Sequence, residues 1–241
     1  MQWIQYQLDN CGTVDELIAT DNKLRIASKG TTPLHYLVAD ATGNVATIEF
    51  LDGKMEVHKG SDLPFPVLTN DTYASSLEQT KTALTSAGGN SISYRNNSID
   101  RFAKACNMLR QFQQTAMTTP VIDYSFDILD KVAQGSHTKW SIVYDISNKK
   151  IYFKTLAYSQ VKNIAFSTFN FNCSAISKAW DMNQAGEGDV AKLFQDFSLD
   201  LNSRMVNRSF DESISEFTVS EENRRTHWQY PGSISCQKVF N

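Results

Sequence analysis

Residues 34–58 read LHYLVADATGNVATIEFLDGKMEVH, and this stretch decides the fold. It contains three runs rich in apolar and β-branched or aromatic residues, 34–40, 45–51 and 54–58, which is the composition of β-strands. Turn sequences separate the runs, because Gly43-Asn44 and Asp52-Gly53 favour tight reversals of the chain. The pattern predicts three consecutive antiparallel strands in a meander.

Helices are expected before this meander. Residues 3–8 (WIQYQL) have an amphipathic helical pattern, and we expect this helix to be mostly buried. Thr13-Val14-Asp15-Glu16 is a capping box, in which Thr13 caps a short helix and Glu16 bonds back to the Thr13 amide.

Helices are also expected after the meander. A short strand over Val67-Leu68-Thr69-Asn70 leads to a helix over 71–84 and a loop over 87–97 rich in Gly, Ser and Asn. Ser98 is then expected to cap a helix that reaches Phe112 with apolar residues at helical spacing. Thr119-Pro120 is expected to start another.

The C-terminal part returns to strands. Residues 140–146, 151–155 and 161–166 have strand patterns, whereas 190–197 favours a helix, and the polar tail from about residue 209 is expected to be loosely ordered. Strands, then helices, then strands again favour a layered α+β fold rather than alternating βαβ units. Since no repeat or low-complexity linker interrupts the chain, we expect one domain over residues 1–241.

Composition limits the function. The 241 residues are 41% hydrophobic and carry a net charge of −3 with no basic stripe, which argues against a nucleic-acid partner. No run approaches the roughly 18 apolar residues of a membrane helix, and no signal peptide is visible. Location therefore stays open: cytoplasmic by default, periplasmic or secreted if a targeting segment precedes this sequence.

Cysteine and histidine spacing gives no sign of a metal. Four cysteines, Cys11, Cys106, Cys173 and Cys236, form no C-x-x-C pair, so we expect neither structural zinc nor a disulfide framework. Cys106 falls on the apolar face of its helix and is expected to be buried and inert. No cofactor is expected.

Aromatic and histidine side chains are expected to be structural. His35 alternates with apolar residues of its strand and is expected to be packed, and Trp3, Trp140 and Trp180 are expected in the core rather than around a substrate.

Several segments together resemble the choloylglycine hydrolase family, the bile salt hydrolases and penicillin V acylases. They lie in the family's order over residues 3–155: Trp3–Asn10 with Thr13–Glu16, Leu34–Lys54, Val67–Asn70, Ser98–Phe102, and Thr138–Ser141 with Asn148–Phe153. The resemblance implies an Ntn-hydrolase-like four-layer αββα sandwich and a homo-oligomer, a tetramer in the relatives. It implies a small-molecule amide substrate such as a conjugated bile salt, penicillin V or an N-acyl amide.

The resemblance also assigns two site residues. Asn70 resembles the asparagine that helps to position the nucleophile and the substrate amide, and Arg101 resembles the arginine near the nucleophile that supports its ionisation. Without the resemblance, Asn70 would be a turn residue and Arg101 a solvated or paired charge in the first turn of a helix.

The family's nucleophile is an N-terminal cysteine whose own α-amine is the base. None of the four cysteines here takes that place, so we expect this chain to be the central and C-terminal portion of such an enzyme, inactive by itself. The alternative is a non-catalytic remnant or ligand-binding module that keeps the scaffold, and whether the chain acts as an enzyme stays open. The loop over 87–97 is the expected substrate-facing segment.

Overall fold

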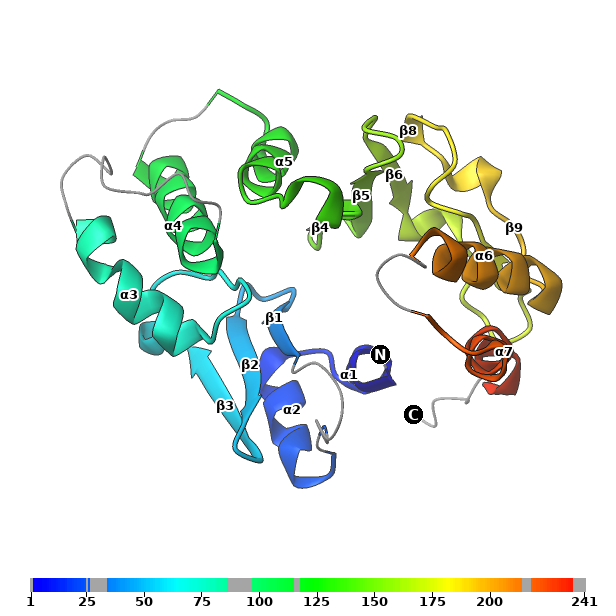
Figure 1. Cartoon of the computed structure of the whole chain (residues 1–241), viewed down its shortest axis with the longest axis horizontal. Coiled ribbons are helices and arrows are strands. Elements are labelled where there is room, and N and C mark those ends of the chain that lie inside the picture. Colours follow the sequence, from blue (N-terminus) through cyan, green and yellow to red (C-terminus); the bar gives the residue numbers. More distant parts are fainter. Residues whose placement is uncertain are drawn as a thin grey trace. The chain divides into compact units, whose positions relative to one another are not determined.

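The computed structural model describes residues 2–24, 26, 34–85, 97–114, 118–213 and 218–235, and its mixed helices and sheets confirm the α+β class. The chain forms two compact units, Met1–Thr138 and Lys139–Asn241, each of which is described by itself. Figure 1 follows the chain from α1 in blue to α7 in red.

The predicted meander is confirmed. β1 (His35–Ala39), β2 (Val45–Leu51) and β3 (Lys54–Lys59) pair antiparallel in that order. The β2–β3 turn places Asp52 at φ 50° and Gly53 at φ 76°, the two positive angles that a tight hairpin of this kind requires. The Asp40 carboxylate closes the β1–β2 turn by accepting bonds from backbone amides within the turn and from the amide of Val14.

One face of this sheet packs against α1 (Gln2–Asn10) and α2 (Val14–Ala19). Trp3 stacks on Tyr36 at 4.4 Å between ring centroids, and Leu17 joins the same apolar cluster. The Thr13–Glu16 capping box is present. The expectation that α1 is mostly buried is wrong, because only the stripe of Trp3 and Gln7 faces inward while Ile4, Tyr6 and Leu8 are exposed.

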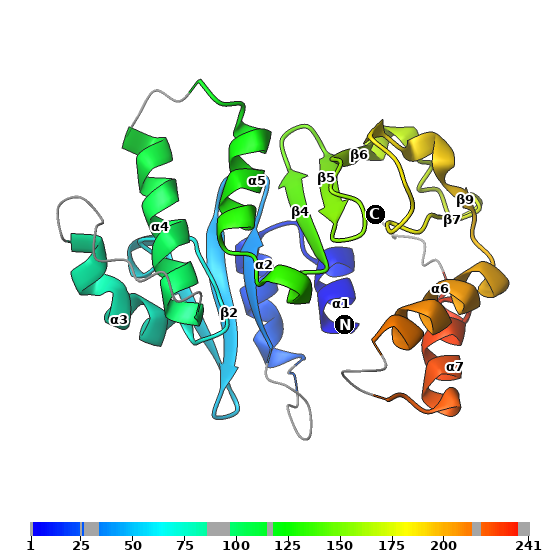
Figure 2. The ribbon, with the colours of Figure 1, turned by 45° about the horizontal axis from the view of Figure 1, so that its top comes forward.

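The other face carries α3 (Tyr73–Thr85) and α4 (Ser98–Gln114), which lie side by side in Figures 1 and 2, with α5 (Val121–Lys131) next to α4. Side chains alternate between the faces of a strand. Ile48 therefore belongs to the cluster of the first two helices, whereas Val45 packs against the cluster around Tyr73, Phe102 and Cys106.

Two local predictions in this unit are wrong. Val67–Asn70 forms no strand, because Val67 packs into the apolar cluster and Thr69 bonds to Ser98 instead of to a neighbouring strand. Ser98 is the first residue of α4 rather than its cap, since the Asn97 carboxamide oxygen accepts the Asp100 amide at 2.9 Å. The predicted 87–97 loop lies outside the described residues up to 96.

The second unit contains the predicted C-terminal strands. β4 (Trp140–Asp145), β5 (Lys150–Thr155) and β6 (Lys162–Ala165) are antiparallel, and β8 (Gly188–Asp189) joins β6 in parallel. β7 (Lys178–Ala179) pairs with β9 (Gln195–Asp196). The short 3₁₀ turns of both units are Thr20–Asn22, Gly60–Asp62, Gly135–His137, Phe166–Thr168, Ala191–Leu193 and Tyr230–Ser233.

The second unit contains a buried lysine that contacts several of its segments. Lys162 is fully buried and donates to the carbonyls of Met182 and Gln184 at 3.1 and 3.2 Å. The rings of Phe153, Tyr158 and Trp180 surround the ammonium at 5.7, 5.4 and 5.8 Å, where ring quadrupoles attract a cation. Burial lowers the pKa of Lys162, and Asp181 partly opposes that shift.

Three C-terminal expectations are wrong. Residues 190–197 form a short 3₁₀ turn and then β9 rather than a helix, and Trp140 is 59% exposed rather than in the core. The tail is helical where it is described. α6 (Leu199–Glu212) and α7 (Glu221–Gln229) lie side by side (Figure 2), joined by the Asn202 carboxamide donating to the Trp228 carbonyl at 2.8 Å.

Candidate functional site

Asn70 lies at the end of a segment that the start of α4 holds in place. The Thr69 hydroxyl lies 3.1 Å from both the carbonyl and the hydroxyl oxygen of Ser98, and the Ser98 hydroxyl accepts the Asp71 amide at 2.9 Å. The residues on both sides of Asn70 are therefore fixed to one side chain 27 to 29 positions further along the chain. This replaces the strand ladder that the sequence pattern suggested.

Arg101 lies in the first turn of α4 and its side chain is buried, with 7% of the residue exposed. Its Nη2 donates to the Asn70 carboxamide oxygen at 2.5 Å, so the structure brings the two residues singled out from the sequence into contact. Its Nε is buried and has no partner among the described residues. Burial lowers the pKa of Arg101, and the nearby Asp71 carboxylate partly opposes the shift.

This arrangement orients the Asn70 amide. Because Arg101 occupies the carboxamide oxygen, the Nδ2 group is left as a donor on an exposed residue. A donor that is fixed before the substrate arrives stabilises negative charge that develops on a carbonyl oxygen during acyl transfer. The pair therefore has the chemistry of a supporting element in an acyl-transfer site, and neither residue is itself a nucleophile.

The described cysteines do not supply a nucleophile. Cys106 is fully buried, which confirms the expected burial, and burial raises the pKa of its thiol to about 12, as expected for an unreactive thiol. The pKa of Cys11 is raised by burial and by Glu16, and its Sγ donates to the Gln7 side-chain oxygen at 3.3 Å. Cys173 is disulfide-bonded, which its sequence spacing did not predict because spacing carries no information on which residues meet in space.

The described ranges contain neither a metal-binding cluster nor a membrane-spanning helix. There, no group of three or more His, Cys, Asp or Glu side chains is placed to hold a metal ion. None of the helices that the structure describes is long and apolar enough to cross a bilayer.

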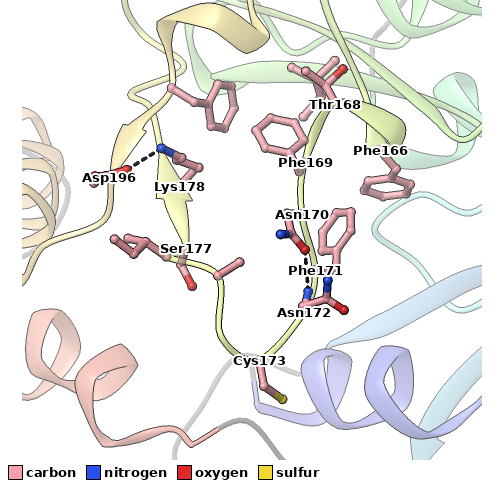
Figure 3. A pocket seen from close by; sticks show the side chains of 14 residues that line it. Phe166, Thr168, Phe169, Asn170, Phe171, Asn172, Cys173, Ser177, Lys178 and Asp196 are labelled. Atoms are coloured by element: carbon pink, nitrogen blue, oxygen red, sulfur yellow. Dashed lines mark hydrogen bonds and ion pairs between the residues drawn. The ribbon is translucent and has the colours of Figure 1, made fainter.

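The second unit has a hollow of about 810 Å³ that the sequence did not reveal. Figure 3 shows Phe166, Phe169 and Phe171 on one wall and the Lys178–Asp196 ion pair on the other, with Cys173 at one end. Asn170 and Asn172 add polar groups, and the Asn172 amide donates to the Asn170 side chain at 3.0 Å. An apolar wall with a few amides is typical of small-molecule sites. Asn70 and Arg101 are not among the residues that line it.

Comparison with known proteins agrees with the sequence resemblance. A family model described as linear amide C–N hydrolases, choloylglycine hydrolase family, matches residues 1–178. Penicillin V acylase from Pectobacterium atrosepticum is 30% identical over 112 residues, which are 43% of this chain and 29% of that protein.

Solved structures show the same fold. Penicillin V acylase from Agrobacterium tumefaciens matches with a TM-score of 0.68 and 22% identity, over 81% of this chain and 66% of that one. Two variants of the conjugated bile acid hydrolase from Clostridium perfringens match with TM-scores of 0.53 and 0.55 at 17% and 15% identity. They cover 66% and 78% of this chain, and 60% and 63% of the relatives. The chain thus spans less than two thirds of each relative's length, and its fold is the Ntn-hydrolase fold of these proteins.

Proposed function

Since this chain belongs to the choloylglycine hydrolase family of linear amide C–N hydrolases, we propose that it forms the supporting part of a linear amide hydrolase. The observation that carries the proposal is the hydrogen bond from the buried Arg101 to the exposed Asn70. Burying a guanidinium costs desolvation free energy. A role in orienting an amide for catalysis explains why a buried arginine is present here despite that cost.

In the proposed reaction, the thiolate of an N-terminal cysteine attacks the amide carbonyl and forms a tetrahedral intermediate. Asn70 Nδ2 contributes to stabilising the oxyanion, and Arg101 holds the Asn70 carboxamide and adds positive charge beside the thiolate. The amine leaves with a proton, and water hydrolyses the thioester to the acid. The described cysteines do not fit the nucleophile's role, so the active protein requires a cysteine-initiated segment besides the residues described.

The substrate class follows the relatives. The relatives are named for penicillin V and for conjugated bile acids. We propose that the substrate is an amide with an apolar acyl group, such as penicillin V, a conjugated bile acid or another N-acyl amide. The homo-oligomeric, tetrameric assembly implied by the family also belongs to the proposal, and sedimentation velocity tests it independently of activity.

Hydrolysis tests the proposed function. Protein purified from its native source is incubated with penicillin V, with glycine- and taurine-conjugated bile acids and with N-acyl amides, and the released amine is measured. We expect release from at least one substrate, loss of release after thiol alkylation, and a fall of about 100- to 1,000-fold in kcat in Asn70→Ala. Exposed Asn148 lies in the β4–β5 turn, outside the proposed site, and Asn148→Ala is the matched control. Binding of these amides without any release would identify a ligand-binding module instead.

A further inference from the structure

A buried carboxylate lies at the centre of the sheet face that α3 and α4 cover. Glu49 of β2 has 1% of its surface exposed, and both its carboxylate oxygens accept the amide of Tyr73, at 3.2 and 3.0 Å. Tyr73 is the first residue of α3, and the first amides of a helix have no partner within the helix. Glu49 therefore supplies an acceptor and a negative charge at the positive end of α3.

Two histidines from the neighbouring strands flank this carboxylate. His35 Nδ1 of β1 lies 3.2 Å from one oxygen, and His58 Nε2 of β3 lies 4.0 Å from the other. Glu56 is the direct cross-strand neighbour of Glu49 in β3 and is exposed. The carboxylate thus has a histidine on each side, with His35 within hydrogen-bond distance, while it faces the helix.

Tyr73 connects Glu49 with the Asn70–Arg101 pair. Its ring meets the Phe102 ring edge-on at 5.8 Å, and Phe102 is the neighbour of Arg101 in α4. Its hydroxyl donates to the Phe65 carbonyl at 3.1 Å, and Thr72 before it accepts the Ser76 amide in the first turn of α3. Asn70 lies only three residues before Tyr73. Both members of the Asn70–Arg101 pair are therefore attached to the residue that Glu49 holds.

We propose that Glu49 is a positioning residue for the Asn70–Arg101 pair, and that it acts by fixing the first amide of α3. The inference rests on the proposed amide-hydrolase function. A buried carboxylate is a costly way to stabilise a strand centre, because an apolar side chain there carries no desolvation penalty. The hydrogen bonds that Glu49 accepts from the Tyr73 amide, at the start of α3, instead fix the orientation of the preceding turn, which carries Asn70.

Kinetics of the active protein test this role. Glu49→Ala is expected to lower kcat for amide hydrolysis on the order of 10- to 100-fold with little change in KM, because a displacement of about 1 Å in a catalytic group has effects of this size. Glu49→Gln keeps one acceptor for the Tyr73 amide and is expected to recover part of the loss. Glu56→Gln, the same change at the facing position on the sheet, is expected to leave kcat unchanged.

A double-mutant cycle separates positioning from general structural support. If Glu49 acts through Asn70, Glu49→Gln lowers kcat by less than about twofold in an Asn70→Ala background. An undiminished loss in that background would overturn the inference, because it would show that Glu49 contributes by another route.

Amide hydrogen exchange tests the same inference without activity. Glu49→Gln is expected to accelerate exchange in residues 71–76 while β2 and the centre of α4 keep wild-type protection, and Glu56→Gln changes neither. Unchanged exchange at residues 71–76 would refute the positioning role. If no amide is hydrolysed by the wild type, the proposed function fails, and the exchange result still decides what Glu49 does.

Discussion

Replacing Asn70 with alanine removes the acceptor that a buried guanidinium uses, and the structure gives the size of the effect. Arg101 is 7% exposed, and its only side-chain hydrogen bond among the described residues goes to Asn70, while its Nε has no partner there. A hydrogen bond to a buried charged group contributes about 1.5–3 kcal/mol. Because Asn70 itself is exposed, water replaces part of this, and we expect Asn70→Ala to cost about 1–2 kcal/mol of unfolding free energy.

Arg101→Met should behave differently. It removes the bond and also the desolvated charge, so we expect a change in unfolding free energy within about 1 kcal/mol of zero. In the Arg101→Met background, Asn70→Ala leaves no buried charge without a partner. It should therefore change the free energy of unfolding by almost nothing. The coupling between the two positions is then about 1–2 kcal/mol, obtained from four urea unfolding curves with a common slope.

An exposed ion pair provides the matched control. Arg204 pairs with Asp200 one turn away on α6, and both side chains are largely exposed. The same cycle with Arg204→Met and Asp200→Ala should give a coupling of about 0.3–0.5 kcal/mol. If Asn70 and Arg101 couple no more strongly than this exposed pair, the reasoning that Arg101 is a buried charge compensated by Asn70 is refuted.

Three further predictions concern the scaffold. Hydrogen bonds from the Thr42 hydroxyl and from the Val14 and other backbone amides lower the pKa of Asp40, so Asp40→Asn should destabilise the fold at neutral pH. The difference from wild type should persist above the ordinary pKa of 3.8 and shrink as pH falls below it, a trend seen by thermal unfolding at several pH values. Burial lowers the pKa of Lys162, so at neutral pH the unfolded chain holds its proton more tightly, and the stability of wild type relative to Lys162→Met should rise as pH approaches 10.5. Iodoacetamide should label Cys106 only after unfolding, which peptide mass analysis detects, and labelling in the native protein would contradict its burial.

The meander was predictable because its signals are local. Turn residues at Gly43 and at Asp52-Gly53 and the strand alternation specify β1, β2 and β3 without reference to the rest of the chain. The capping box at Thr13 is equally local, and the structure confirms it.

Elements held by distant side chains were not predictable. Val67–Asn70 has strand composition, but Ser98, far along the chain, takes its hydrogen bonds. Residues 190–197 looked helical, yet the chain pairs Gln195–Asp196 with Lys178–Ala179. The polar composition of the tail does not predict an ordered structure. Contacts between α6 and α7 order it, and they join residues that are apart in the sequence: Arg224 donates to Asp211, 13 positions earlier, at 2.6 Å.

Part of the candidate site is predictable from the sequence and part is not. Sequence motifs indicate Asn70 and Arg101, and the structure adds that their side chains are in contact. Glu49 was not singled out, because nothing in its strand pattern distinguishes a carboxylate at a solvent-facing position from one that meets the start of a helix 24 residues later. Only the register of β2 and the packing of α3 reveal it.

We propose above that the Asn70–Arg101 pair supports amide hydrolysis by an N-terminal cysteine. The most direct measurement is intact mass and N-terminal sequencing of the active protein from its native source, before and after alkylation with iodoacetamide. We expect a polypeptide that begins with cysteine, one added carbamidomethyl group at that residue, and loss of amide hydrolysis in proportion to the labelling. Amide hydrolysis by a preparation without any cysteine-initiated polypeptide, or hydrolysis that survives full labelling of that cysteine, would contradict this proposal.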